Sequence, residues 1–224
     1  MIVNSMSDKT IAILYSGQPR DFIECWENHL KYFGAFGAGN MLSIFAHFWE
    51  PVSHDFADFI DREVDPCVVE YEEAKTFSHP TIESDPRYYH PLNNIASQAY
   101  SLYKASMLMD KYVQDAEIEK FDCVIRTRTD NWFTEPLGKL SDYDPKGLHI
   151  TDIKSHTDYA LGDTFAFGDY DTMMAYCRMY PDFENICAEG AIVNPECILG
   201  WNVKRNNLIV HKHPFYPKLY RDVR

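Results

Sequence analysis

Apolar residues in the first half of the chain form short runs that alternate with stripes at helical spacing. The runs have strand length and cover residues 10–15, 41–49 and 66–72. The first stripe, Phe22, Ile23, Trp26, Leu30 and Phe33, predicts a helix, and Pro19 suits its first turn. A short helix is predicted over 56–60, and the glycine-rich residues 34–39 predict a loop.

The second half begins with an irregular segment and then returns to regular patterns. Residues 75–93 are rich in proline, aromatic and charged residues, which predicts a surface excursion, either an ordered loop or a flap over a cleft. The clearest helix covers 94–113, with the apolar stripe Ile95, Ala99, Leu102, Ala105, Met109 and Tyr112. Strands are predicted at 121–130, 147–151, 162–168 and 207–215, and helices at 170–180 and 195–205.

This alternation of strands and helices predicts an α/β sandwich whose central sheet is mostly parallel, at least in its first half. A chain of 224 residues fits one such domain, 1–224, better than two. Ligands of parallel sheets bind at the carboxyl ends of the strands. Three features fall at such ends: the Ser16–Arg20 turn, His47, and the charged stretch Arg126–Asp130.

Charge and cysteine content narrow the possible partners and the compartment. The formal net charge of −13 argues against a nucleic-acid-binding or anionic-membrane-binding protein. None of the six cysteines forms a C-x-x-C pair, so we expect free thiols in a reducing compartment, with Cys123 and Cys197 buried. No run approaches the length of a membrane span, and the first residues do not resemble a signal peptide, so we expect a soluble cytoplasmic protein.

The turn after the first strand is a candidate anion site. Ser16 and Gly17 end the strand, and a helix follows, so backbone N–H groups there can face an anion to which Arg20 adds a guanidinium. Tyr15 can stack on a base or pack in the core. The turn lacks the glycine patterns of dinucleotide-binding and P-loop proteins, and an ordinary strand-to-helix turn is the alternative.

The sequence FDCVIRTRTDNWF, residues 121–133, carries the second candidate. Residues two apart in a strand share a face, so Arg126, Arg128 and Asp130 point the same way if the strand continues that far. Two cations and a carboxylate at a strand end predict a site for a diphosphate and a metal ion. An internal Arg–Asp salt bridge is the alternative.

Four motifs in this order resemble a group of small GT-A-like glycosyltransferases from microbes and viruses. The motifs are IAILYSGQPR, FDCVIRTRTDNWF, GDTFAFG and a later Pro-Glu before a helix, and the resemblance covers residues 11–215. It implies a nucleotide-sugar-binding half over about 1–130 and an acceptor half over about 131–224. It also implies that the protein acts in a bacterium or in a virus-infected host cell.

The resemblance implies a divalent cofactor, Mn²⁺ or Mg²⁺, at the acidic D-x-D motif of such enzymes. Here Arg128 stands at the first acid, so Asp130 alone remains to meet an ion, and metal dependence is open. A late histidine completes the metal site in some of these families, which makes His211 a candidate ligand. His211 and His213 share a face of the last strand, and packing histidines are the alternative.

Two acids are candidates for the base that an inverting transferase needs. Glu196 follows Pro195 at a predicted helix start, where such enzymes often place an acid, and it is our first choice. Asp163 begins a strand and is the second choice, or it holds hydroxyl groups of the substrate. Charge favoured by the helix dipole at Glu196, and a loop hydrogen bond at Asp163, are the alternatives.

These observations favour a glycosyltransferase that moves a sugar from a nucleotide-diphosphate sugar to a glycan, polysaccharide or other hydroxyl acceptor. Cations such as Arg20, Arg126 and Arg128 would stabilise the charge that develops on the departing diphosphate. A nucleotidyltransferase is one alternative. A catalytically inactive carbohydrate-binding protein is the other, and the arginine at 128 supports it.

Overall fold

Seven strands form one mixed sheet in the order β3-β2-β1-β4-β7-β6-β8. Their bounds are β1 (Thr10–Gly17), β2 (Met41–Glu50), β3 (Cys67–Glu73), β4 (Cys123–Thr127), β6 (Leu148–Thr151), β7 (Phe165–Gly168) and β8 (Val210–His213). Only β7 runs against its neighbours, because β4 and β6 both pair with it antiparallel while the remaining pairs are parallel. The predicted α/β fold with a mostly parallel sheet is therefore confirmed. The structure is a computed structural model that describes residues 9–37, 41–64, 67–79, 82, 91–155, 157–215 and 217–223.

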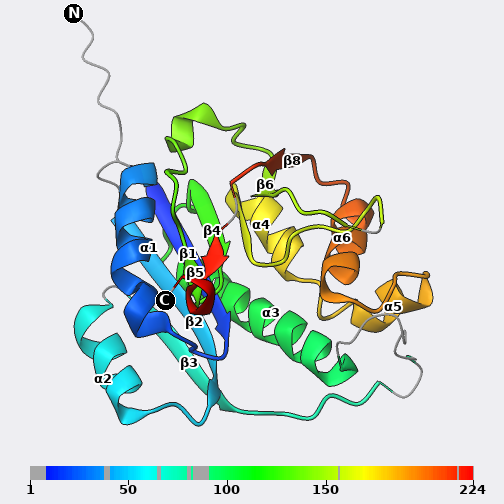
Figure 1. The fold of residues 1–224 in the computed structure, drawn as a ribbon, viewed down its shortest axis with the longest axis horizontal. Helices are drawn as coiled ribbons and strands as arrows, with labels where there is room; N and C mark the ends of the chain where they lie inside the picture. The colour runs from blue at the N-terminus through cyan, green and yellow to red at the C-terminus, as the bar shows by residue number, and fades with distance from the viewer. Residues whose placement is uncertain are drawn as a thin grey trace, which may run out of the picture.

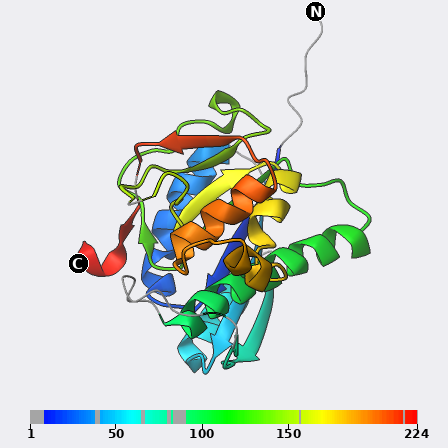
Figure 2. The ribbon, with the colours of Figure 1, turned by 90° about the vertical axis from the view of Figure 1, so that its right-hand side faces the viewer.

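Helices cover both faces of the sheet, as Figures 1 and 2 show. The helices α1 (Phe22–Gly37) and α2 (His54–Glu63) lie on one face, and α3 (Leu92–Asp115), α4 (Tyr170–Cys177) and α6 (Pro195–Arg205) lie on the other. The short α5 (Phe183–Ala188) packs beside α6. Each face has its own apolar core, one built around Phe22, Phe33 and Phe165, and the other around Leu102, Met173 and Ile198. The chain is thus a single three-layered domain.

The helix α1 differs from its prediction in length and in orientation. It runs through the glycine-rich residues predicted as a loop and ends at Gly37, while Pro19 lies before it rather than in its first turn. Ile23 and Leu30 are 39% and 40% exposed, because the buried stripe passes through Trp26, His29 and Phe33 instead. At the end of α3, Tyr112 was also predicted to lie in the buried stripe, but it is 38% exposed.

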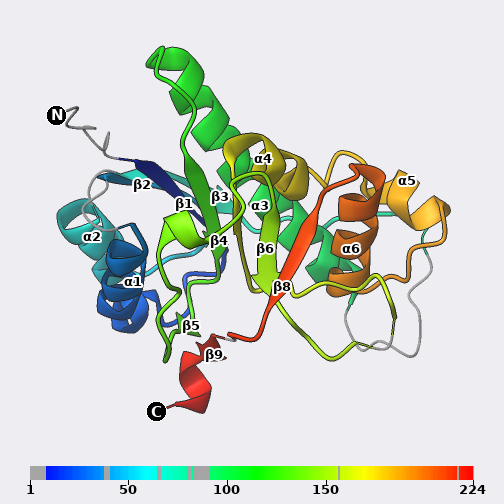
Figure 3. The same cartoon turned by 90° about the horizontal axis from the view of Figure 1, so that it is seen from above.

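The central strand β4 ends at Thr127, earlier than the sequence pattern suggested. A turn follows and leads into β5 (Asn131–Trp132), which pairs with β9 (Lys218–Leu219) in a separate two-stranded sheet near the chain end (Figure 3). The Asn131 side-chain amide donates to Thr127 Oγ1 at 2.9 Å and to the Thr164 carbonyl at 2.9 Å, and these bonds close the turn.

Other predictions concern the surface and the cysteines. Much of the predicted excursion at 75–93 lies outside the described residues, so its two interpretations both stay predictions. The five cysteines whose state is described are free thiols, and Cys123 and Cys197 are buried as predicted. Within the described ranges, no helix combines the length and apolar character that crossing a membrane requires.

His29 connects α1 to the residues that follow β4. Its ring is fully buried; Nε2 donates to the Asn131 carbonyl at 2.7 Å, and Nδ1 accepts from the Tyr15 hydroxyl at 2.9 Å. A carbonyl can only accept, so the proton of the neutral ring lies on Nε2. Burial lowers the pKa of His29 to about 4, although the Asn131 bond and the Asp130 charge oppose the shift.

We expect acid to destabilise the protein in part through His29. Its folded pKa of about 4 lies below the ordinary value of 6.5, so the folded state binds fewer protons between these pH values. The stability contributed by the neutral ring is therefore present above about pH 6.5 and is lost as the pH falls towards 4, at about 1.4 kcal/mol per unit.

Denaturant unfolding at pH 7 and pH 5 measures this loss. The change for the unmodified protein should exceed that for His29→Gln by about 2 kcal/mol, and the exposed His54→Gln should behave like the unmodified protein. An unchanged pH dependence in His29→Gln would contradict this role of the buried ring.

Candidate functional site

The candidate residues of several elements meet at the carboxyl-terminal edge of the sheet. Gly17 ends β1, and Arg128 and Asp130 follow β4. Because β7 runs in the opposite direction, Asp163, just before it, lies at the same edge. The backbone N–H of Arg128 donates to the Thr164 carbonyl at 3.1 Å, which joins the segments after β4 and before β7. This is the edge where parallel sheets bind ligands.

The turn between β1 and α1 has the backbone that its sequence predicts. Ser16 and Gly17 are half-buried, and Gly17 has a φ of 99°, a value that favours glycine. Arg20 is exposed, and the Thr129 hydroxyl donates to the Gln18 carbonyl at 3.1 Å, so the turn packs against the segment after β4. Tyr15 points into the core beside His29 and is fully buried, which is the packing alternative rather than base stacking.

Arg128 and Asp130 bind each other. Arg128 donates from Nε to Asp130 Oδ1 and from Nη2 to Oδ2, both at 2.8 Å, and the Asp130 side chain is only 5% exposed. Burial would raise the pKa of Asp130, but the Arg128 hydrogen bonds and the charges of Arg128 and Arg20 hold it below its usual value. The internal salt bridge that the sequence left as an alternative is therefore present for this pair.

The residues do not fit the divalent ion that the resemblance implied. Both Asp130 oxygens already accept from Arg128. His211 lies on β8, three strands away from β4, and contacts Gly147 at the amino-terminal start of β6. It also lies 3.4 Å from Asp144 and stacks on His149. The structure thus places His211 three strands away from β4, and the candidate ligand group found among the described residues contains neither Asp130 nor His211, so a metal ion at these residues stays a prediction.

Another group of described residues has the composition of a metal site. Ligand atoms of His47, Glu70 and Glu72 lie within 4.8 Å of one another on β2 and β3. However, Lys104 donates to Glu70 at 2.6 Å, and Lys75 pairs with Glu72. The chain's own ammonium groups therefore already neutralise both carboxylates, and we assign no ion to this group.

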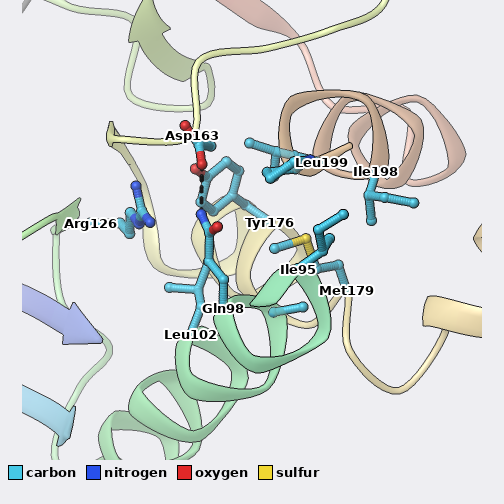
Figure 4. Close-up of a pocket in the computed structure, with 11 residues that line it drawn as sticks. Ile95, Gln98, Leu102, Arg126, Asp163, Tyr176, Met179, Ile198 and Leu199 are labelled. Carbon is cyan, nitrogen blue, oxygen red and sulfur yellow. Dashed lines mark hydrogen bonds between the residues drawn. The ribbon is translucent and has the colours of Figure 1, made fainter. Parts of the chain in front are cut away.

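Arg126 is the most unusual residue at the edge. It lies in β4 and lines a cavity with residues of α3, α4 and α6 (Figure 4). It is 2% exposed, and its Nε and Nη1 atoms have no hydrogen-bond partner in the described part of the chain. A buried guanidinium stays protonated and is costly to desolvate, so this cation requires a compensating negative group.

A small cavity lies in front of Arg126. Its volume of about 10 Å³ has room for about one water molecule. Arg126, Gln98, Asp163 and Tyr176 supply its polar groups, and the rest of its wall is apolar: Ile95, Ala99, Leu102, Met179, Pro195, Ile198 and Leu199. Gln98, Asp163 and Pro195 are half-buried while the other lining residues are buried, so the solvent side of the cavity lies at these three.

Asp163 lines the cavity, whereas Glu196 does not. Gln98 Nε2 donates to Asp163 Oδ2 at 2.6 Å across the cavity, as Figure 4 shows. Glu196 is the second residue of α6, whose N-cap Asn194 accepts from the Glu196 N–H at 3.0 Å. The structure thus brings Asp163 and Arg126 together and leaves Glu196 at the helix start, so Asp163 becomes the first candidate for the base.

Further polar atoms near the cavity also lack partners among the residues that the structure describes. They are the hydroxyls of Tyr176, Thr164 and Thr151 and the amide oxygen of Asn131. Thr151 contacts Gly162, and Asn131 binds the Thr164 carbonyl, so these atoms surround the segment before β7. Buried polar atoms normally have partners, which include ordered water, so a water molecule or a ligand atom would satisfy these groups.

Sequence reasoning missed Gln98 and Tyr176. Both lie on helices that the periodicity predicted correctly, but a single sequence does not reveal which residues of a buried stripe face Arg126. Burial raises the pKa of Tyr176, although the charge of Arg126 opposes the shift, so its hydroxyl remains a neutral donor.

Comparisons with known proteins identify no family for this chain. A scan against protein-family models finds no match, and a search of curated proteins finds no relative. The arrangement shown is an α/β domain with a mixed, mostly parallel sheet and a polar cavity at its carboxyl-terminal edge.

We expect the Arg128–Asp130 pair to stabilise the fold measurably. A double-mutant cycle with Arg128→Met and Asp130→Asn should give a coupling free energy of about 1–2 kcal/mol, because Asp130 is buried and accepts two charged hydrogen bonds.

Denaturant unfolding supplies the cycle, with Arg221→Met and Asp222→Asn as the matched control. That pair is about 60% exposed and 3.8 Å apart, so its coupling should be near zero. Equal coupling in the two pairs would show that the Arg128–Asp130 contact does not hold the turn.

Proposed function

We propose that this protein is a glycosyltransferase that uses a nucleotide-diphosphate sugar and transfers the sugar to a hydroxyl of a glycan or another acceptor. One observation carries the proposal. Arg20, Arg126 and Arg128 all lie at or just after the carboxyl ends of β1 and β4, and Nε and Nη1 of Arg126 have no hydrogen-bond partner among the described residues. An anionic ligand at this edge would match them.

The arginines suggest a division of roles. Arg20 is exposed and the Arg128 side chain is 28% exposed, and both lie close enough to Asp130 to lower its pKa. We assign the diphosphate to these two, since a bulky charged group can reach them. The bond between the anomeric carbon and the diphosphate oxygen breaks with its electrons passing to that oxygen, where two guanidinium charges would stabilise them.

We assign to Asp163 the role of the base that accepts the proton of the attacking hydroxyl in an inverting reaction. Its carboxylate lies at the solvent side of the cavity, where an acceptor can approach. Its bond from Gln98 fixes its orientation. A half-buried carboxylate held by one neutral donor can still accept a proton.

No step of this proposal uses a metal ion, because the Asp130 oxygens are occupied by Arg128. The same contact favours a second candidate function, a carbohydrate-binding protein without catalytic activity. The two functions differ in whether free nucleoside diphosphate appears.

Incubating the protein with UDP, GDP, CDP and dTDP sugars and a mixture of glycan acceptors tests the proposal. We expect release of one nucleoside diphosphate at a rate that chelation of divalent ions leaves unchanged. Release of pyrophosphate would instead indicate a nucleotidyltransferase, and no release with any donor would leave the binding protein as the better account.

With a productive donor in hand, the role of Asp163 can be tested. Asp163→Asn should lower kcat by about 10²–10⁴-fold, since it removes the base, while leaving donor affinity nearly unchanged. Glu196→Gln should have a much smaller effect, and the exposed Asp171→Asn should have none. If Glu196→Gln proves the more damaging change, the base lies at the start of α6.

A further inference from the structure

The cavity beside Arg126 restricts the charge and the size of its ligand more than the exposed arginines do. Among the described residues that line it, Arg126 is the only cation; it is 2% exposed, and two of its nitrogen atoms have no hydrogen-bond partner there. The Tyr176 hydroxyl, fully buried, also lacks a partner among the described residues. Both residues line the same cavity, so three donor atoms are available to a ligand atom.

The charge of the cavity selects a monovalent anion. Asp163 lines the same cavity as Arg126, and the two are not an ion pair among the described contacts, although both charges act on Tyr176. A divalent phosphate group would meet the Asp163 carboxylate as well as the arginine, and like charges at short range repel. A monovalent anion balances the charge of Arg126 and meets the Asp163 carboxylate with one negative charge instead of two, so this repulsion is smaller.

Size and shape favour a carboxylate. A volume of about 10 Å³ admits one oxygen-sized atom beside the guanidinium and excludes a tetrahedral group with three outward oxygens. A planar carboxylate can place one oxygen there and the other towards Gln98, whose side chain borders the solvent side. Arginine recognises such planar pairs of acceptors.

We propose that the Arg126 cavity binds the carboxylate of an acidic sugar, such as a uronic acid, within the substrate. The identity of the carrier as a sugar rests on the proposed function, whereas the anion itself follows from the cavity. The cavity has room for a carboxylate oxygen alone, so the sugar ring would lie outside it, at the side where the half-buried Gln98 and Asp163 are found.

Thermal unfolding tests the proposal without any nucleotide, in a buffer free of halide and carboxylate ions. D-glucuronate at about five times its dissociation constant should raise the unfolding midpoint by about 2–4 °C. D-glucuronamide, which has the same shape without the charge, and D-glucose should leave the midpoint unchanged. Sodium bromide tests whether a small free anion stabilises the protein without a sugar.

Arg126→Met tests the residue itself. It removes a buried charge that lacks a partner, so its midpoint without ligand should rise by about 2 °C or more, and glucuronate should no longer shift it. Arg178→Met is the control, because Arg178 is 44% exposed and pairs with Asp110. It should keep the full glucuronate response. If Arg126→Met does not fold, Arg126→Lys should fold and retain about half the response or less.

Several results would overturn the proposal. Stabilisation by bromide without stabilisation by glucuronate would show a structural halide site. An equal glucuronate shift in Arg126→Met and the unmodified protein would place the sugar elsewhere, and no shift with any probe would show that the cavity binds no anion. None of these measurements uses a nucleotide sugar. Binding of glucuronate would therefore stand even if the protein has no transferase activity, and transferase activity would stand even if glucuronate does not bind.

Discussion

The account depends on one constraint: a permanently charged guanidinium lies inside the protein, and two of its nitrogen atoms have no hydrogen-bond partner among the described residues. Arg126 is held at the end of the central strand, where neighbouring strands on both sides fix the backbone. Such a charge costs several kcal/mol unless it is compensated. A stable fold tolerates that cost when a ligand removes it, which is why strained or unsatisfied groups gather at functional sites.

The three arginines of the edge meet this constraint in different ways. Arg128 has an internal partner and so stabilises the turn that closes β4. Arg20 is exposed and is screened by water. Of the three, Arg126 alone is buried and has nitrogen atoms without a hydrogen-bond partner among the described residues, and it lines the same cavity as Asp163. In our proposal, the exposed arginines of this edge bind the diphosphate and the cavity of Arg126 binds a smaller anion.

The sequence predicted the sheet and most helices because long apolar runs and stripes record burial directly. The sequence-based prediction failed where a single contact decides the local structure. The i, i+2 rule placed Arg126, Arg128 and Asp130 on one face, but the Asn131 amide closes a turn at Thr127, and alternation ends there. At α1, the hydrogen bonds of His29 make a polar residue part of the buried stripe, which hydrophobicity alone does not reveal. The cavity could not be predicted without knowing which α3 and α4 side chains face β4.

A crystal structure of the protein grown with D-glucuronate and without nucleotide tests the central claim most directly. The account predicts a carboxylate within hydrogen-bonding distance of Arg126 Nε and the Tyr176 hydroxyl, with the sugar ring directed towards Gln98. An ordered water molecule in that position, with the sugar bound elsewhere or not at all, would contradict it.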